Sequence, residues 1–407
     1  MKKLTTGIKT ALLAGAALSA TSASATDKEL LETLYQNGVL NQAQFEKLSK
    51  KADEKEAASN TANISPELAK ALDWASRVKI GGDMRFRQEN IDTDIAGKGV
   101  KESRQRIRAR LKVAAKINDE VDVGFRLVTA GGQTSSNETL EGSFGGKDIY
   151  FDRAYINWHP DFLNGLTASF GKFKQPWYNV SSDGLIWDSD VNPEGVALSY
   201  KTKVGPVKLV ATGGYFILED GDTMSGKSSN DGFSDDLNMY HAGLSATMKL
   251  TDSIKGSIGS NAYIYNKEEK LQQGAPKTNL ENESMEIYEV AGKLDIDTGI
   301  LPVFFLAQYA TNASAKSGED TAWLAGFGGK YGPFKLAYNY RDTQKNAVAD
   351  TFNDSDFSAG AAASRGHKIK GSYKISKNFS TGLAYFAAEQ YDGINVETFQ
   401  WDLKAKF

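Results

Sequence analysis

The sequence predicts an all-β fold, a transmembrane antiparallel β-barrel of about sixteen strands that follows a short helical segment. Three observations indicate this fold. From about residue 79 to the end, apolar and polar residues alternate with the period of two that is typical of strands. Short and long connections alternate between the predicted strands. The chain ends in VETFQWDLKAKF, which places aromatic side chains on one face of a last strand and terminates at Phe407.

Residues 1–25 have the features of a secretory signal. Lys2 and Lys3 give a positive start, residues 8–20 are apolar, and Ala23-Ser24-Ala25 is a small-residue cleavage site. The apolar run is shorter than the roughly 18 residues that a membrane-spanning helix needs. We therefore expect cleavage after Ala25 instead of a helical anchor.

Residues 26–78 predict a helical periplasmic segment, because their apolar residues have the helical period. Leucines between residues 30 and 34 indicate a first short helix. Asn41 is placed to cap a second helix that carries Phe45 and Leu48, and Ser65-Pro66-Glu67 has the form of a further helix start. Two interpretations stay open: a module that oligomerises or contacts the cell wall, and a solvated tether.

The composition excludes several classes of protein. After residue 25 no apolar stretch approaches the roughly 18 residues of a membrane-spanning helix, which excludes a helical membrane protein but not a barrel. The 407 residues include no cysteine, so hydrogen bonds and burial must hold the fold without disulfides. A net charge of -3 argues against nucleic acid as a partner. The remaining chain, residues 79–407, is assigned to the barrel.

Sixteen strands are predicted in residues 79–407 from the alternation of apolar and polar residues. They lie at about 79–91, 104–117, 120–130, 149–159, 166–177, 194–204, 207–218, 237–250, 253–266, 285–297, 301–312, 321–331, 334–342, 366–376, 379–390 and 396–407. Tight turns at one end and long polar loops at the other predict a barrel with both termini in the periplasm. Aromatic residues near strand ends suit interfacial girdles, namely Trp158, Trp177, Tyr200, Trp323, Tyr331 and Trp401.

The last strand resembles the C-terminal signature of bacterial outer-membrane porins, because it ends in an aromatic residue that shares a face with Phe399 and Trp401. The chain is similar to the putative-porin families of sixteen-stranded barrels. It also has some similarity to the phosphate-selective porins, since KIGGDMRFRQE at Lys79 resembles their first strand and FGKFKQPW at Phe170 their fifth. The resemblance implies a passive diffusion channel in the outer membrane of a Gram-negative bacterium. It also implies contact with membrane lipid and lipopolysaccharide, and a homotrimer.

Basic residues share one face of the second predicted strand, SRQRIRARLKVAA. An arginine on the lipid face at mid-membrane costs about 2–4 kcal/mol, so five basic residues must instead line the lumen. Neighbouring strands add further candidates. The predicted pore-lining set is Arg85, Arg87, Arg104, Arg106, Arg108, Arg110, Lys112, Arg126, Arg153, Lys172 and Lys174.

A ladder of guanidinium groups lowers the barrier for passing anions, because these groups stay charged and present planar donors to oxyanions. We therefore predict that small hydrophilic solutes pass with a preference for anions. In the alternative interpretation, the arginines pair with lumenal carboxylates and contribute little selectivity, which leaves a non-selective or cation-preferring general porin. The candidate carboxylates are Asp83, Asp122, Asp152, Glu289 and Asp295.

The connection YNVSSDGLIWDSDVNP, residues 178–193, lies between the fifth and sixth predicted strands, where general porins carry their constriction loop. If it folds inward, Asp183, Asp188 and Asp190 face the basic wall across a narrow passage, and the transverse field orients dipolar solutes. An exposed loop is the alternative.

Other sites have little support in the sequence. The run Asp350 to Asp356 superficially suggests a calcium loop, but it lacks the ligand order and glycine of an EF-hand. No nucleophile or zinc motif occurs, so we expect neither an enzyme nor a metal or cofactor. A barrel that acts on lipids and a barrel that serves as a structural anchor or adhesin are kept as competing functions. The large lumen of a sixteen-stranded barrel favours the channel.

Overall fold

The computed structural model describes residues 31–37, 39–60, 73–95, 97–182, 184–219, 237–266, 285–316 and 318–407. The chain divides into two compact units, with the boundary between Lys79 and Ile80. The predicted signal and the predicted helix start at Ser65 lie outside the described residues.

The first unit contains three helices in its described part, at residues 31–36, in α2 (Gln42–Asn60) and at residues 73–77. The backbone N–H of Gln44 donates to Asn41 Oδ1 at 2.9 Å, and the backbone N–H of Asn41 donates to Gln44 Oε1 at 3.1 Å. This reciprocal pair satisfies two N–H groups that a helix start leaves without partners. The predicted cap at Asn41 is therefore confirmed. The rings of Tyr35 and Phe45 stack with their centroids 4.6 Å apart and join the first helix to α2.

The second unit is a closed barrel of sixteen antiparallel strands, as predicted. A further two-residue strand, β4 (Glu138–Thr139), pairs with β2 inside a connection. The barrel strands are β1 (Val78–Ile95), β2 (Lys98–Lys116), β3 (Val121–Val128), β5 (Tyr150–Trp158), β6 (Leu166–Lys172), β7 (Glu194–Val204), β8 (Val207–Glu219), β9 (Leu237–Lys249), β10 (Ile254–Tyr265), β11 (Glu286–Ile296), β12 (Val303–Asn312), β13 (Thr321–Tyr331), β14 (Phe334–Thr343), β15 (Ser364–Lys374), β16 (Phe379–Gln390) and β17 (Asn395–Lys406).

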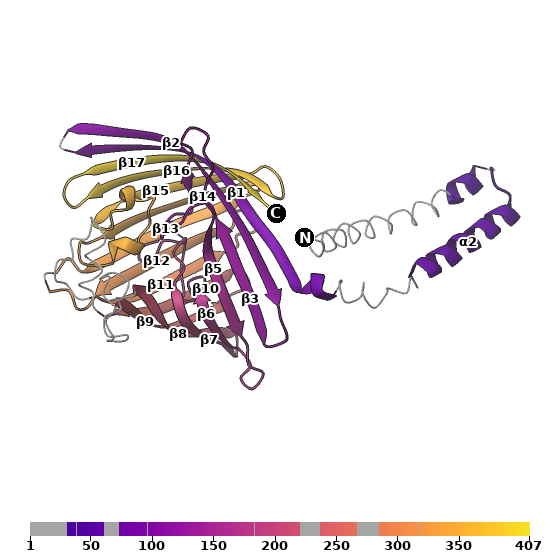
Figure 1. Cartoon of the computed structure of the whole chain (residues 1–407), viewed down its shortest axis with the longest axis horizontal. Coiled ribbons are helices and arrows are strands. Elements are labelled where there is room, and N and C mark those ends of the chain that lie inside the picture. The colour runs from indigo at the N-terminus through magenta and orange to yellow at the C-terminus, as the bar shows by residue number, and fades with distance from the viewer. Residues whose placement is uncertain are drawn as a thin grey trace. The chain divides into compact units, whose positions relative to one another are not determined.

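Pairing between β1 and β17 closes the barrel, with Asp83 opposite Lys406 and Asp94 opposite Asn395. In Figure 1 the yellow C-terminal strands accordingly lie beside the purple N-terminal ones. Closure gives every strand two hydrogen-bonded neighbours, so no sheet edge is left open.

The two faces of the strands differ as the alternation predicts. On β17, the outward side chains of Phe399 and Trp401 are 41% and 37% exposed, whereas the inward Gln400 between them is 1% exposed. On β9, Leu244 points outward and His241 is buried inward. At these positions apolar side chains point outward and polar ones point inward. Among the described residues no helix is both long and apolar enough to cross a membrane.

One strand ends earlier than predicted, and this changes the lumen. The alternation of FGKFKQPW predicts a strand to residue 177, but β6 ends at Lys172. Gly171 has φ +105°, a conformation that side-chain-bearing residues rarely adopt, and Pro176 has no N–H for a sheet ladder. The chain therefore turns inward. Trp177, which the sequence suggests for the outer girdle, is instead buried with 4% exposure.

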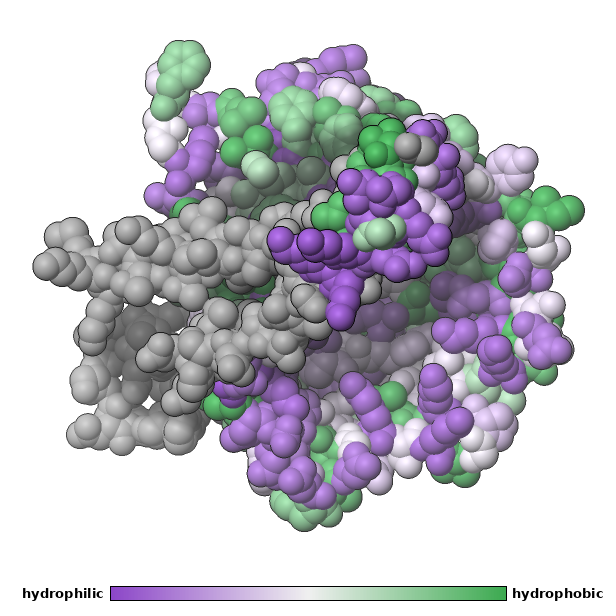
Figure 2. Space-filling view, turned by 90° about the vertical axis from the view of Figure 1, so that its right-hand side faces the viewer, coloured by the Kyte–Doolittle hydropathy of each residue, from purple (hydrophilic) through white to green (hydrophobic). Residues whose placement is uncertain are grey.

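The connections form two distinct ends of the barrel. Seven short connections lie at the turn end, at residues 117–120, 159–165, 205–206, 250–253, 297–302, 332–333 and 375–378. The other, loop end carries the long connections, although the connection between β1 and β2 and the one between β16 and β17 are short. Figure 2 shows hydrophilic side chains gathered around a hollow at the end that faces the viewer, with hydrophobic side chains towards the outer rim.

Candidate functional site

Three connections from the loop end reach into the lumen: loop A (residues 129–149), loop B (residues 173–193) and loop C (residues 344–363). Loop B contacts distant parts of the wall. Asn261 Nδ2 on β10 donates to the carbonyl of Tyr178 at 3.1 Å, and Arg341 on β14 donates to the carbonyl of Gly184 at 3.1 Å. These contacts are on different strands, so the loop crosses the interior and is not an exposed loop.

Aromatic packing holds loop B inside the barrel. Trp177 and Trp187 lie 4.7 Å apart between ring centroids, and Trp187 stacks on Phe352 of loop C at 5.2 Å. Tyr263 from β10 contacts both tryptophans at 5.4 Å. This apolar cluster packs against the inner face of β7 to β13.

Two aspartates of loop B, Asp188 and Asp190, meet the other loops, while the third predicted one, Asp183, lies outside the described residues. Asp190 accepts hydrogen bonds from Ser136 Oγ of loop A at 3.0 Å and from Arg110 at 3.3 Å. Asp190 thus bonds directly to the basic wall instead of facing it across an open gap.

The arginines of β2 face inward, and carboxylates of β1 neutralise most of them. Asp83 accepts from Arg108 and from Arg110, each at 2.8 Å. Glu89 accepts from Arg104 at 2.6 Å and lies 3.5 Å from Arg106. The β2 arginines therefore form a paired network, as the carboxylate alternative expects for Asp83.

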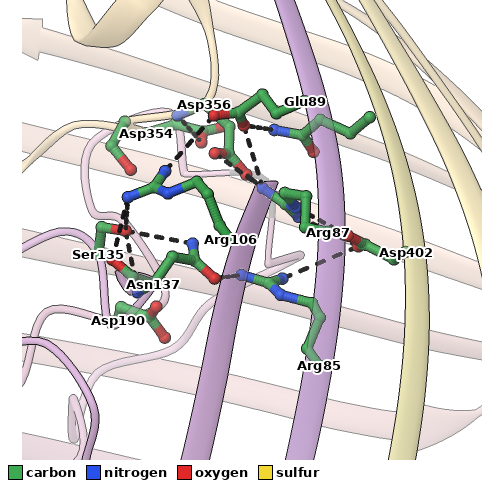
Figure 3. Close-up of polar contacts among 12 residues, drawn as sticks. Arg85, Arg87, Glu89, Arg106, Ser135, Asn137, Asp190, Asp354, Asp356 and Asp402 are labelled. Atoms are coloured by element: carbon green, nitrogen blue, oxygen red, sulfur yellow. Dashed lines mark hydrogen bonds and ion pairs between the residues drawn. The ribbon is translucent and has the colours of Figure 1, made fainter. Parts of the chain in front are cut away.

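The two arginines of β1 are enclosed by β17 and the loops (Figure 3). Arg87 Nε donates to Asp402 at 2.7 Å, and Arg87 Nη1 donates to Asp356 of loop C at 2.9 Å. Arg85 donates to the side chain of Asn137 of loop A and lies 3.9 Å from Asp402. Both arginines are thus anchors for loops and not free cations along an open wall.

The remaining predicted basic residues have different surroundings. Arg126 pairs with Asp152, and Arg153 Nε donates to Asn192 of loop B at 2.7 Å. Lys172 pairs with Glu194. Lys112 and Lys174 are exposed, and Lys174 lies beyond the end of β6, where strand alternation no longer decides its direction.

The sequence also suggests four further carboxylates as arginine partners. Asp152 does pair with an arginine, whereas the other three have other partners. Asp122 binds His159 at 2.6 Å, Asp295 binds Lys293 at 2.5 Å, and Glu289 accepts from Asn261 at 2.9 Å. These arginine–carboxylate pairs are therefore concentrated on β1, β2, β3, β5 and β17.

A cavity of about 800 Å³ lies between the three loops and the turn end. Its lining includes eleven basic and eight acidic side chains, an excess of positive charge. The predicted pore-lining set contains none of the lysines among them, which lie on β9, β10, β11, β13, β14, β15 and β17: Lys249, Lys255, Lys293, Lys330, Lys335, Lys368, Lys370 and Lys404. Each lies on the polar face of its strand, so the same alternation that selected the β2 arginines could have found them.

Loop C was also missed as a part of the site, since its sequence reads as a long polar loop. Its apolar residues Ala347, Val348 and Phe352 are buried in the lumenal cluster. Apolar residues at these positions within an otherwise polar connection are the signal that could have indicated an inward fold.

Burial and neighbouring charge separate the loop carboxylates in their pKa. Burial, with the nearby charge of Asp354, raises the pKa of Asp188 to about 7. Burial alone would also raise the pKa of Asp354, but the charges of Lys368 and Arg341 outweigh it and hold that pKa below its usual range. The Arg87 guanidinium in the same way outweighs burial and lowers the pKa of Asp356.

Within the part of the chain that the structure describes, no group of three or more histidine, cysteine, aspartate or glutamate side chains is arranged to bind a metal ion.

Comparison with known proteins identifies the family. The profile of the family described as "Putative porin" matches residues 94–288 and 329–407, more than half of the chain. Among solved structures, OprB of Pseudomonas putida at high pH is 10% identical with a TM-score of 0.55, and the match covers 85% of this chain and 98% of that chain. A substituted variant of the Rhodopseudomonas blastica porin is 12% identical with a TM-score of 0.47, covering 81% of this chain and 100% of that chain.

Among curated proteins, none matches the chain in sequence. The likeness to OprB supports the barrel fold, and the family match together with that fold indicates a channel rather than an enzyme. The chain therefore belongs to the putative-porin family.

Proposed function

We propose that the protein is an outer-membrane porin of a Gram-negative bacterium, a passive diffusion channel for small hydrophilic solutes with a preference for anions. The observation that carries the anion preference is the excess of basic over acidic side chains around the cavity of about 800 Å³. A positive potential in a narrow aqueous passage lowers the barrier for anions and raises it for cations.

Lysines contribute more to this preference than the enclosed arginines do. Lys249 lies directly opposite Lys255 on the neighbouring strand, and Lys330 lies directly opposite Lys335. All four are exposed. Like charges in facing positions are destabilising, so these two pairs concentrate positive potential that a passing anion would reduce.

The preference is tested by recording the reversal potential of the purified protein in a planar bilayer under a KCl gradient. We expect a potential of the sign that chloride preference produces, and a smaller one in Lys249→Gln plus Lys335→Gln. Cation preference in the native protein would contradict the proposal. Arg365→Ala, which removes an exposed outward-facing charge, is the matched control and should change nothing.

The arginine ladder has its own test in Arg106→Ala plus Arg108→Ala. Unchanged selectivity in that variant would show that the ladder anchors loops without attracting anions.

We further propose contact with membrane lipid and lipopolysaccharide, and a homotrimer. A mass of one chain for the protein in mild detergent would contradict the trimer.

A further inference from the structure

Loop C is attached to the barrel wall by ion pairs at two points. At the first point, the side chain of Arg87 is 4% exposed and contacts Asp356 at 2.9 Å. Figure 3 shows Asp356 from loop C facing Arg87 and Glu89 on β1. Connections usually run over the surface of a protein, so a loop carboxylate bonded to the inner wall fixes the loop in the lumen.

At the second point, Asp354 binds two cations from different strands. Arg341 on β14 and Lys368 on β15 contact the same carboxylate oxygen at 2.7 Å and 2.9 Å. The side chains of both cations are 3% exposed or less. Removing charges from water is costly unless they are paired, so Asp354 compensates two buried cations at once.

All three loops meet at the loop junction, which is formed by Thr134 of loop A, Asp188 of loop B and Ser355 of loop C. Ser355 Oγ donates to the carbonyl of Thr134 at 2.9 Å, and the backbone N–H of Ser355 donates to Asp188 at 3.1 Å. All three residues line the cavity. The loops therefore meet across the lumen and bound the passage together.

We propose that loop C is a second constriction element beside loop B, and that its attachment to Arg87, Arg341 and Lys368 sets the size limit of the passage. This inference rests on the diffusion-channel part of the proposed function and does not depend on the preference for anions.

The first test measures solute size. We compare the rates at which a monosaccharide and a trisaccharide enter liposomes that contain the protein. In Asp356→Asn, Arg87 retains Asp402, so the barrel folds while loop C loses one attachment. We expect the trisaccharide rate, relative to the monosaccharide rate, to rise several-fold.

The matched control is Asp161→Asn, which removes one exposed carboxylate at the short connection between β5 and β6, away from the cavity lining. We expect it to keep the native ratio of the two rates. An unchanged ratio in Asp356→Asn, or an equal rise in Asp161→Asn, would overturn the inference. A native protein that admits neither sugar nor KCl current would instead overturn the diffusion channel itself.

A second variant tests the role of loop C without changing the charge of Asp356. The chain has no cysteine, so Asp188→Cys with Ser355→Cys, whose side-chain oxygens lie 3.3 Å apart, introduces a single possible disulfide. Oxidised, the pair joins loops B and C and should keep the native ratio. Reduced, it lacks the native hydrogen bonds, and the ratio should rise. Equal ratios before and after reduction would contradict a constriction that depends on loop C.

The junction should also respond to pH. The charged groups around Asp188 are Asp190 on its own loop, Asp354 with its partners Arg341 and Lys368, and Arg110 on Asp190. We call the arrangement in which the three loops meet at the loop junction the closed arrangement. Because its pKa is raised from about 4 to about 7, the Asp188 carboxyl stabilises the closed arrangement fully below about pH 4. This contribution is lost as the pH rises through about 7.

Asp354 and Asp356 act in the opposite direction, because their lowered pKa values stabilise the closed arrangement above about pH 4 and lose that effect in stronger acid. We therefore expect the trisaccharide rate, relative to the monosaccharide rate, to be larger at pH 8 than at pH 5. Asp188→Asn, which stays neutral, should keep the low ratio at both values. A native ratio that is equal at both pH values would contradict the role of this carboxylate.

Discussion

Two ion pairs of similar geometry differ in what surrounds them. Arg87 and Asp402 are joined at 2.7 Å, and their side chains are 4% and 9% exposed. Arg365 and Glu389 are joined at 2.9 Å, and their side chains are 49% and 47% exposed. Water screens the second pair, whereas the first has little water to solvate a charge that loses its partner.

The first prediction follows from this difference. Asp402→Asn should lower the free energy of unfolding by about 3–5 kcal/mol, because it leaves Arg87 buried with less compensation. Glu389→Gln should lower it by less than about 1 kcal/mol. Urea unfolding in detergent micelles, followed by tryptophan fluorescence, measures both. Equal effects would show that water reaches the inner pair.

Gly171 lies one residue before the end of β6, in a backbone conformation that favours glycine. A Cβ atom on Gly171 would lie 2.4 Å from the carbonyl oxygen of Ala154, and its φ of +105° is strained for any other residue. Gly171→Ala should therefore destabilise the barrel by about 1–3 kcal/mol. The matched control is Gly371→Ala, because a Cβ there meets nothing within 4 Å. Thermal unfolding in detergent compares the two, and a stable Gly171→Ala variant would contradict the strain.

At the scale of elements, loops A, B and C pack inside the lumen although they connect strands at the loop end of the barrel. Loop B keeps its place through apolar burial as well as hydrogen bonds, since Trp187 is 5% exposed between Trp177, Tyr263 and Phe352. Burial of this aromatic cluster offsets the entropy lost when a long connection is ordered.

Removing the central ring should release loop B. Trp187→Ala is expected to weaken its docking by about 3–5 kcal/mol and to increase trypsin cleavage after the exposed Lys174. The matched control is Trp323→Ala on β13, which removes an outward ring that is 41% exposed and should leave loop B protected. Mass spectrometry of the fragments identifies the cleaved bond. Equal protection of Lys174 in both variants would contradict anchoring by Trp187.

At the scale of the whole molecule, the barrel depends on a seam between its first and last strands. The backbone N–H of Gly82 donates to the carbonyl of Phe407 at 3.0 Å, and the N–H of Phe407 donates to the carbonyl of Gly82 at 3.1 Å. The last residue thus completes the closure as well as carrying an exposed outward ring.

Deletion of Phe407 should therefore reduce the fraction of chains that close. The deletion removes two backbone hydrogen bonds at an edge that otherwise stays open to water or to another strand. Phe407→Tyr keeps the backbone bonds and an aromatic ring, so it should assemble as the native chain does. The difference in electrophoretic mobility between heated and unheated samples measures closure. Native closure of the shortened chain would contradict the importance of this residue.

Much of the barrel could be predicted because strand alternation is a local property of the sequence. The bounds of β9 and β14 lie within a few residues of those predicted, since each strand exposes an apolar face and buries a polar one. β6 departs from its prediction because Gly171 and Pro176 act on the backbone, to which side-chain alternation is insensitive.

The sequence by itself determined the sixteen strands, the outward face that ends in Phe407 and the inward direction of the β2 arginines, because alternation and the cost of a charge in lipid depend on each strand alone. Only the tertiary structure decided what those inward charges do. Arg87 lies 269 residues from Asp356 and 315 from Asp402, so their contacts arise from closure of the barrel and from the inward fold of loop C. A local sequence pattern does not show burial or pairing. The structure shows that basic residues predicted to line an open wall bind the three loops instead.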